Sequence, residues 1–321
     1  MNAANSVHAA DRLVASTATT GSIACVGLDP RPELLPSSLV ADALRAHEDP
    51  LDQVCHAFLA FNQGVLDAVA GACAAVKPQS ACYEAYGWRG WRVLEATIEH
   101  AHSLGIPVIL DAKRGDIGST AIHYRQGLLT EAPVLEEGAS VRGLGVDWIT
   151  ASPFLGSDSV EPLIGSVDEG KGAFILARTS NPGADDVQGL LVGGEHLSTV
   201  VARLVHEWGV SRIGDSGYSD VGAVVGATWP QIAAALRQLM PHTLFLVPGF
   251  GAQGGSAAHA VAGASKRGDG VLVSSSRAIA GAWQSADADS EFAAAARDAL
   301  DRMNDLLNAA MAAQATSRTA S

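Results

Sequence analysis

The chain has 321 residues, of which 48% are hydrophobic and 17% are charged, so it is long enough to bury a large core. Its formal net charge of −13 repels nucleic acid and anionic membrane surfaces, which argues against partners of either kind. Any anion that binds must therefore meet a local site, made of backbone amides and one or two cations.

The cysteines and the amino-terminal residues bear on the compartment. The four cysteines form no Cys-x-x-Cys pair, which favours free thiols in a reducing compartment. The first residues show no basic stretch followed by an apolar core, the pattern of a signal peptide. No apolar run reaches transmembrane length. These patterns predict a cytoplasmic protein.

Eight short apolar runs predict eight β-strands. The runs are continuous rather than alternating, as expected of parallel strands that are buried on both faces. The predicted strands, in chain order, cover residues 22–28, 73–77, 107–111, 147–151, 173–177, 221–226, 243–247 and 270–275.

Helical patterns separate these runs. In the first of them Phe58, Phe61 and Val65 share a face at the helical period. Eight strand–helix units predict a closed (β/α)8 TIM barrel, with an open doubly wound sheet as the alternative. We expect residues 1–312 to form this single barrel domain. The predicted helices cover residues 51–71, 84–104, 195–208, 228–240, 255–265 and about 290–312.

Two segments fall outside the repeating pattern. Residues 130–145 interrupt the strand–helix alternation, and we expect them to form a lid or an extra loop. Residues 313–321 are small and polar, a composition that predicts a disordered tail.

Polar residues follow most of the predicted strands. In a barrel the carboxyl ends of the strands meet at one rim, where catalytic groups gather. Strands one, two, three, five and eight end in or run into a polar side chain, namely Asp29, Lys77, Asp111, Ser180 and Arg277. Any one of them could be a cap or a surface charge, but together they predict one shared site.

The most charged stretch is ILDAKRGDIGST, residues 109–120. Asp111 and Lys113 are two residues apart at a strand end, so we expect them to share a face. Opposite charges on a partly desolvated strand end would hold Lys113 protonated and fixed, as a proton donor beside a carboxylate. Asp116 could point across an interface between subunits. The alternative is a solvated cluster of salt bridges.

A glycine-rich loop follows the seventh strand. Residues 249–254, GFGAQG, match the G-x-G-x-x-G pattern, but Asp269 precedes the next strand, where it could not reach a dinucleotide ribose. We interpret the loop as a phosphate cradle, because glycines let backbone N–H groups approach an anion. Arg277 would add a bidentate cation. A tight structural turn is the alternative.

Seven segments between residues 25 and 279 together resemble the orotidine 5′-phosphate decarboxylases, in their longer bacterial form (the type 2 subfamily). They read CVGLDPRPE, AVKPQSACYEAYG, ILDAKRGDIGST, TSNPGADDVQ, VVGATWP, VPGFGAQGG and SSSRAI. The resemblance implies a TIM barrel that converts orotidine 5′-monophosphate to UMP and CO₂ with no metal or organic cofactor.

The resemblance also implies roles for individual residues. Lys113 would protonate C6 of the pyrimidine as CO₂ leaves, and Asp111 would sit beside the scissile carboxylate. The other implied site residues are Lys77 and Asp29 at the ribose hydroxyls and in the charge network; Ser180 at the pyrimidine edge; Pro248 and Gln253 in a closing loop, with Gln253 bridging base and phosphate; Gly254, Gly255 and Arg277 at the phosphate; and Asp116, Ile117 and Thr120, supplied by the partner subunit of a homodimer.

Two other functions stay open at this point. Related barrels act on sugar phosphates as decarboxylases or aldolases, and use Mg²⁺ to stabilise an enediolate. A non-catalytic phosphate-binding protein would keep the glycine loop but could lose Lys113, so the intact set of Asp111, Lys113 and Asp116 argues against it.

Overall fold

The computed structural model describes residues 7–251, 254–286 and 289–319. Within these residues eight strands form one sheet, in the hydrogen-bonded order β2-β1-β12-β11-β10-β7-β6-β3. The strands are β1 (Ala24–Leu28), β2 (Ala75–Pro78), β3 (Ile109–Arg114), β6 (Trp148–Ala151), β7 (Gly172–Arg178), β10 (Ser219–Val225), β11 (Thr243–Val247) and β12 (Val271–Ser275). Each overlaps one of the eight predicted strands.

The sheet closes into a barrel. Neighbouring strands in it pair in parallel. The outermost strands of the order, β2 and β3, are joined by parallel bridges from Val76 to Val108 and from Gln79 to Asp111. The predicted (β/α)8 barrel is therefore confirmed, and the open doubly wound sheet is excluded.

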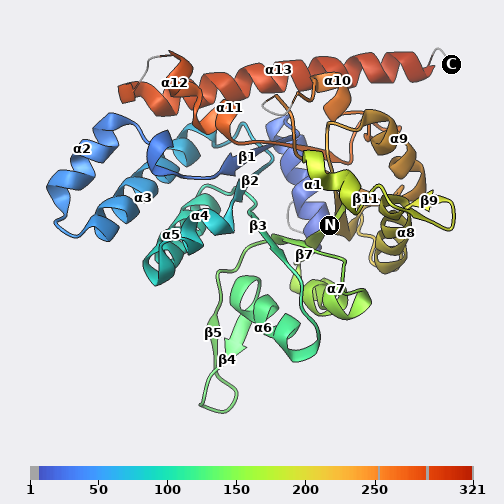
Figure 1. Cartoon of the computed structure of the whole chain (residues 1–321), viewed down its shortest axis with the longest axis horizontal. Coiled ribbons are helices and arrows are strands. Elements are labelled where there is room, and N and C mark those ends of the chain that lie inside the picture. Colours follow the sequence, from blue (N-terminus) through green and yellow to red (C-terminus); the bar gives the residue numbers. More distant parts are fainter. Residues whose placement is uncertain (1–6, 252–253, 287–288, 320–321) are drawn as a thin grey trace.

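Helices surround the barrel, as Figure 1 shows. Two predictions need correction: the helix predicted over residues 84–104 begins only at Gly87, where φ is 61°, and residues 255–265 contain only a four-residue helix. The helices of four or more residues beyond α1 are α2 (Ser37–Ala46), α3 (Pro50–Val69), α4 (Ser80–Glu84), α5 (Gly87–Ser103), α6 (Gly118–Leu128), α7 (Ser157–Ile164), α8 (Leu197–Gly209), α9 (Pro230–Leu239), α10 (Ala257–Ala260), α11 (Arg277–Ala280), α12 (Ala282–Ala286) and α13 (Phe292–Thr319).

The core has two layers. The larger cluster lies between the strands and the surrounding helices. The smaller one fills the barrel with inward-facing side chains such as Cys25, Trp148 and Phe174. Leu13, on a helix that the sequence analysis did not predict, is buried in this inner cluster. That helix is α1 (Ala9–Thr20), which Figure 1 shows in the centre of the molecule.

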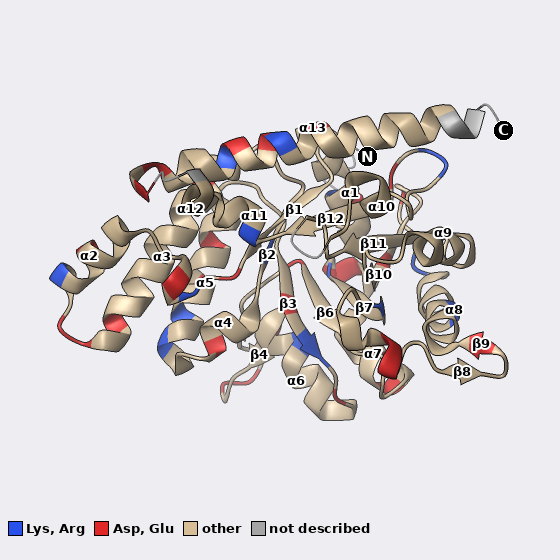
Figure 2. Ribbon diagram, turned by 45° about the horizontal axis from the view of Figure 1, so that its top comes forward, with Lys and Arg blue, Asp and Glu red and all other residues tan. Residues whose placement is uncertain are grey.

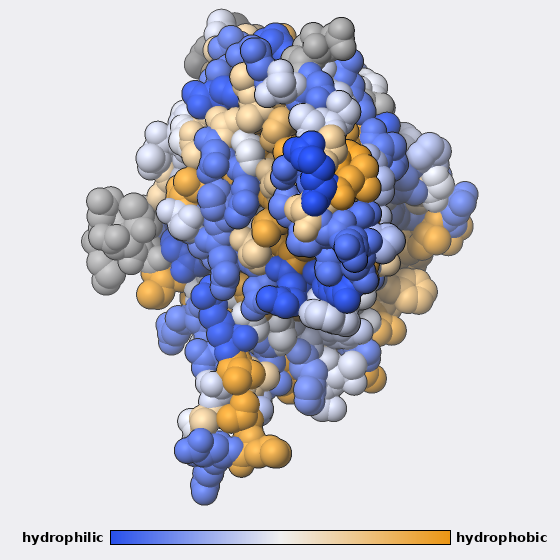
Figure 3. Space-filling model, turned by 90° about the vertical axis from the view of Figure 1, so that its left-hand side faces the viewer, coloured by the Kyte–Doolittle hydropathy of each residue, from blue (hydrophilic) through white to orange (hydrophobic). Residues whose placement is uncertain are grey.

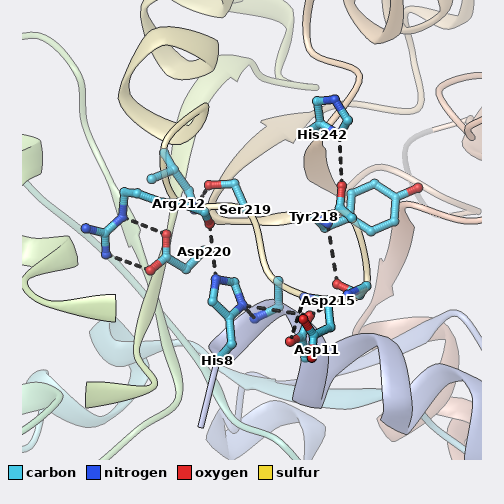
Figure 4. Close-up of polar contacts among 12 residues, drawn as sticks. His8, Asp11, Arg212, Asp215, Tyr218, Ser219, Asp220 and His242 are labelled. Carbon is cyan, nitrogen blue, oxygen red and sulfur yellow. Dashed lines mark hydrogen bonds and ion pairs between the residues drawn. The ribbon is translucent and has the colours of Figure 1, made fainter. Parts of the chain in front are cut away.

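Polar contacts hold α1 against the loop that leads into β10 (Figure 4). The imidazole Nε2 of His8 lies 3.1 Å from the carbonyl oxygen of Arg212. The Asp11 carboxylate accepts backbone hydrogen bonds from Asp215 at 3.0 Å and Ser216 at 2.8 Å. The guanidinium of Arg212 pairs with Asp220 at 2.6 Å. Because Arg212, Asp215 and Ser216 precede β10, α1 covers the amino-terminal end of the barrel.

The segment 130–145 is an extra hairpin rather than a lid. Its strands β4 (Glu131–Pro133) and β5 (Ser140–Arg142) pair in antiparallel fashion. Lys171, which precedes β7, donates to the carbonyl oxygens of Gly145 at 3.0 Å and Val146 at 2.8 Å. The hairpin therefore joins the barrel near the amino-terminal ends of the strands. It projects from the molecule and exposes apolar atoms (Figures 1 and 3).

The carboxyl-terminal segment is helical further than predicted. The helix α13 extends to Thr319, so the prediction of disorder is wrong for residues 313–319. Alanine and glutamine have favourable helix propensities, which explains the extension. Ala296, Leu300 and Leu307 anchor the earlier part of α13 in the outer core. Among the described residues, no helix combines the length and hydropathy needed to cross a membrane.

Candidate active site

A cavity of about 480 Å³ opens at the carboxyl ends of the barrel strands. Its floor includes Leu176, Val224 and Leu246, which belong to or pack on the inner core. Among the predicted site residues, its lining contains Asp29, Lys77, Asp111, Lys113, Ser180, Pro248 and Arg277. Side chains from distant parts of the chain thus meet at one rim, as the strand ends predicted.

The carboxylate of Asp111 organises the charged side of this cavity. Its Oδ2 accepts from Lys77 Nζ at 2.8 Å and from Gln79 Nε2 at 3.2 Å. Its Oδ1 accepts from Lys113 Nζ at 2.5 Å and from Thr150 Oγ1 at 3.0 Å. Four donors from three strand ends therefore fix this carboxylate. The sequence analysis did not predict the contribution of Gln79 or Thr150.

The charges of Asp111 and Lys77 stabilise one another. Burial alone would raise the pKa of Asp111, but the ammonium groups of Lys77 and Lys113 outweigh it, so this pKa lies well below its ordinary value. Burial alone would lower the pKa of Lys77, but the carboxylates of Asp111 and Asp29 outweigh it and the pKa is raised. Both groups are therefore ionised at neutral pH.

Lys113 has an unusual backbone. Its φ of 48° is in the left-handed region, and no other non-glycine residue in the described part of the chain has a positive φ. The register between β3 and β6 shifts between Leu110 and Arg114, as in a β-bulge. Lys113 does share the cavity with Asp111 as predicted, but the bulge directs its side chain there, not regular strand alternation. Figure 2 shows acidic and then basic residues at the end of β3.

Asp29 follows β1 and keeps a free acceptor. Its Oδ1 is buried and has no hydrogen-bond partner among the described residues. A buried oxygen is normally satisfied by a hydrogen bond. Because Asp29 lines the cavity, this oxygen is available to a hydroxyl group of a bound ligand.

The loop after β7 carries Ser180 and is held on both sides. The Gln188 amide accepts from the backbone N–H of Thr179 and donates to its hydroxyl, each at 2.8 Å. The indole of Trp229 donates to the Thr179 carbonyl oxygen at 3.1 Å. These contacts position the residue before Ser180, which itself lines the cavity.

The opposite side of the cavity suits an anion. Gly249 and Gly254 have φ values of 95° and 88°, which side chains rarely allow. A Cβ at Gly255 would come within 2.7 Å of the Gly249 carbonyl oxygen. Gly254 and Gly255 belong to this loop but do not line the cavity, and Gln253 lies outside the described residues. Arg277 has no ion-pair partner among the described residues, so its charge is available to a ligand.

Asp116, Ile117 and Thr120 do not reach the cavity of their own chain. They lie just before and within the start of α6, where Asp116 Oδ1 accepts from the backbone N–H of Ile117 at 2.8 Å. The side chain of Ile117 is exposed. Ile122 and Tyr124 of α6 are also exposed, and so are Phe154 and Leu155 in the segment after β6.

Comparisons with known proteins agree with this arrangement. A sequence model of the orotidine 5′-phosphate decarboxylase / HUMPS family matches residues 24–291. Proteins named orotidine 5′-phosphate decarboxylase are similar to this chain: that of Rhodopirellula baltica is 46% identical over 84% of this chain and 87% of its own length, and that of Haloarcula marismortui is 43% identical over 85% and 87%. The solved Leishmania donovani OMP decarboxylase superposes with a TM-score of 0.71, with 32% identity over 95% of this chain and 98% of that one. The chain belongs to the orotidine 5′-phosphate decarboxylase / HUMPS family.

Proposed function

We propose that this protein converts orotidine 5′-monophosphate to UMP and CO₂, the last step of de novo UMP synthesis. The observation that carries the proposal is the contact between Lys113 and Asp111, 2.5 Å from Nζ to Oδ1. It lies in a cavity whose other side is lined by Arg277. An ammonium beside a fixed carboxylate is the pair that a decarboxylation with proton transfer needs.

In the proposed reaction the bond between C6 and the carboxyl carbon breaks, and its electron pair remains on C6. The Lys113 ammonium donates a proton to C6, which yields UMP. The neutral lysine regains a proton from solvent after the product leaves. Asp111 holds the ammonium in place and lies beside the substrate carboxylate.

A comparison of free energies assigns most of the rate acceleration to Lys113. An acceleration near the top of the enzyme range requires about 20 kcal/mol. Repulsion between two carboxylates about 4 Å apart supplies roughly 4 kcal/mol at an effective dielectric constant near 20. Most of the remainder must come from the Lys113 ammonium, which faces the charge that develops on C6. Binding energy from the remote phosphate adds to it.

The remaining contacts are those that the family resemblance implies. Asp29 and Lys77 would bind the ribose hydroxyls, and Ser180 would contact the pyrimidine edge. The phosphate would be held by Arg277 and the backbone near Gly254 and Gly255, with Pro248 and Gln253 completing the same loop. The Asp29 oxygen and the Arg277 charge, neither of which has a partner among the described residues, support this orientation.

We also propose that the enzyme is a cytoplasmic homodimer and that residues 1–312 form its single domain. Asp116, Ile117 and Thr120 would enter the site of the partner subunit. The exposure of Ile117, which is 51% accessible, supports this assignment, because an exposed isoleucine gains stability when a partner covers it.

The test is loss of the ultraviolet absorbance of orotidine 5′-monophosphate, measured with EDTA present. The variants are wild type, Lys113→Ala and, as a matched control, Lys266→Ala, which removes an exposed lysine outside the cavity. We expect activity in the wild type and in the control, and none in Lys113→Ala.

Two results would contradict the proposal. Equal activity in Lys113→Ala would remove the proton donor from the mechanism. No activity in any of the three proteins would favour a Mg²⁺-dependent reaction on a sugar phosphate, and the same proteins would then be assayed on those substrates with added Mg²⁺.

A further inference from the structure

One buried hydroxyl connects the two groups at the centre of the site. Thr150 lies on β6 with 1% of its surface accessible. Its Oγ1 donates to Asp111 Oδ1 at 3.0 Å and accepts from the backbone N–H of Lys113 at 2.9 Å. A single side chain therefore bonds both to the Asp111 carboxylate and to the backbone that carries the Lys113 ammonium.

The β-bulge explains why this hydroxyl is needed. Leu110 pairs with Ile149, and the next paired residue of β3 is Arg114, which faces Ala151. Three residues of β3, from 111 to 113, therefore lie opposite Thr150 alone. The bulge interrupts the regular ladder at Lys113, and the Thr150 hydroxyl accepts its N–H instead. The left-handed backbone of Lys113 is disfavoured by its own Cβ, so it depends on such external bonds.

We infer that Thr150 is a positioning residue for the reaction: through its hydroxyl it holds Lys113 and Asp111 at the separation and direction that proton transfer to the substrate requires. This inference rests on the proposed function. Thr150 acts through its two partners, so its loss should lower kcat and leave KM for orotidine 5′-monophosphate nearly unchanged.

Three variants separate positioning from a general loss of packing. Thr150→Val keeps the branched shape and removes the hydroxyl. Thr150→Ser keeps the hydroxyl and removes a methyl group. Thr97→Val is the matched control, because Thr97 is also 1% accessible and its hydroxyl also makes two hydrogen bonds, to Val93 and Asn62, outside the cavity.

Kinetics are measured well below the melting temperature of each protein. We expect Thr150→Val to lower kcat roughly ten- to hundred-fold, the range for a lost hydrogen bond to a charged group. KM should stay within about twofold, because the phosphate and ribose contacts remain. Thr150→Ser should recover most of kcat, and Thr97→Val should lose thermal stability while its kcat stays within about twofold of wild type.

The outcomes distinguish this inference from the proposed function. A wild type without activity on orotidine 5′-monophosphate would contradict the proposed function itself. An active wild type with an unchanged kcat in Thr150→Val would overturn the inference alone. Equal losses in Thr150→Ser and Thr150→Val, or an equal loss of kcat in Thr97→Val, would also overturn it, because the hydroxyl would then not be the cause.

Discussion

The ammonium of Lys77 and the carboxylate of Asp111 form a buried ion pair, 2.8 Å from Nζ to Oδ2. The two groups come from neighbouring strands, β2 and β3, at the point where the barrel closes. Removing one partner of a buried pair leaves the other charge without compensation, which costs far more than losing a surface pair. This contact therefore stabilises the barrel as well as the site.

The pair should make stability depend on pH at both extremes. The pKa of Asp111 is lowered by folding, so its contribution is complete above about pH 4 and is lost as pH falls through the folded value. The pKa of Lys77 is raised, so its contribution is complete below about pH 10 and is lost as pH rises through the folded value. Urea unfolding across pH should show a plateau between these limits.

Lys77→Met tests the origin of that plateau. We expect it to lower the free energy of unfolding at pH 7 by about 3–5 kcal/mol. It should also weaken the dependence of stability on pH in the alkaline range. Lys266→Met, at an exposed position, should change it by less than about 0.5 kcal/mol. A Lys77→Met protein as stable as wild type would contradict the prediction.

The left-handed backbone at position 113 should make glycine more stable there than alanine. Lys113→Ala and Lys113→Gly both remove the ammonium, but only alanine keeps a Cβ in a conformation that disfavours it. We expect the glycine variant to have the higher free energy of unfolding, by about 1 kcal/mol. At position 112 φ is not positive, so Ala112→Gly should instead lower the free energy of unfolding. A more stable alanine variant would show that φ at 113 is not strained.

Arg277 should discriminate between substrates with and without a phosphate. We expect Arg277→Ala to lower kcat/KM for orotidine 5′-monophosphate by roughly two to three decades, because a bidentate charged contact is lost. The rate with orotidine, which has no phosphate, should not change. Arg277→Lys should recover part of the loss as a point charge. An equal loss with orotidine would mean that Arg277 acts on another part of the substrate.

Mixed variants test whether Asp116 enters the partner's site. Lys113→Ala and Asp116→Ala should each be nearly inactive alone. A mixed dimer, however, contains one site with both side chains intact, so mixing and refolding should restore activity to roughly a quarter of the sites. The control is the same mixture without subunit exchange. No recovery after exchange would place Asp116 in the site of its own subunit or outside both.

The strands and the rim could be predicted because both depend on local patterns. Parallel strands buried on two faces appear as continuous apolar runs in the sequence. The residue that follows each run lies at the carboxyl end of the strand, on the rim of the barrel. This logic predicted Asp29, Lys77 and Asp111 at the rim, and the cavity contains them.

Other features depend on contacts between distant residues and leave no local pattern. The helix α1 is alanine- and threonine-rich, and its burial follows only from its position in the end of the barrel. In the sequence Thr150 is an ordinary strand residue, and its role becomes apparent only from the register between β3 and β6. Gln79 likewise joins the site because the barrel closes between β2 and β3.

The position of α1 also limits the space beneath the active site. The side chains of the inner core, with Ala9, Ala10 and Leu13 of α1 among them, fill the barrel beneath the cavity. The space for a ligand is therefore the cavity at the rim, and one nucleotide that occupies it excludes another. For the proposed reaction we expect UMP to be a competitive inhibitor.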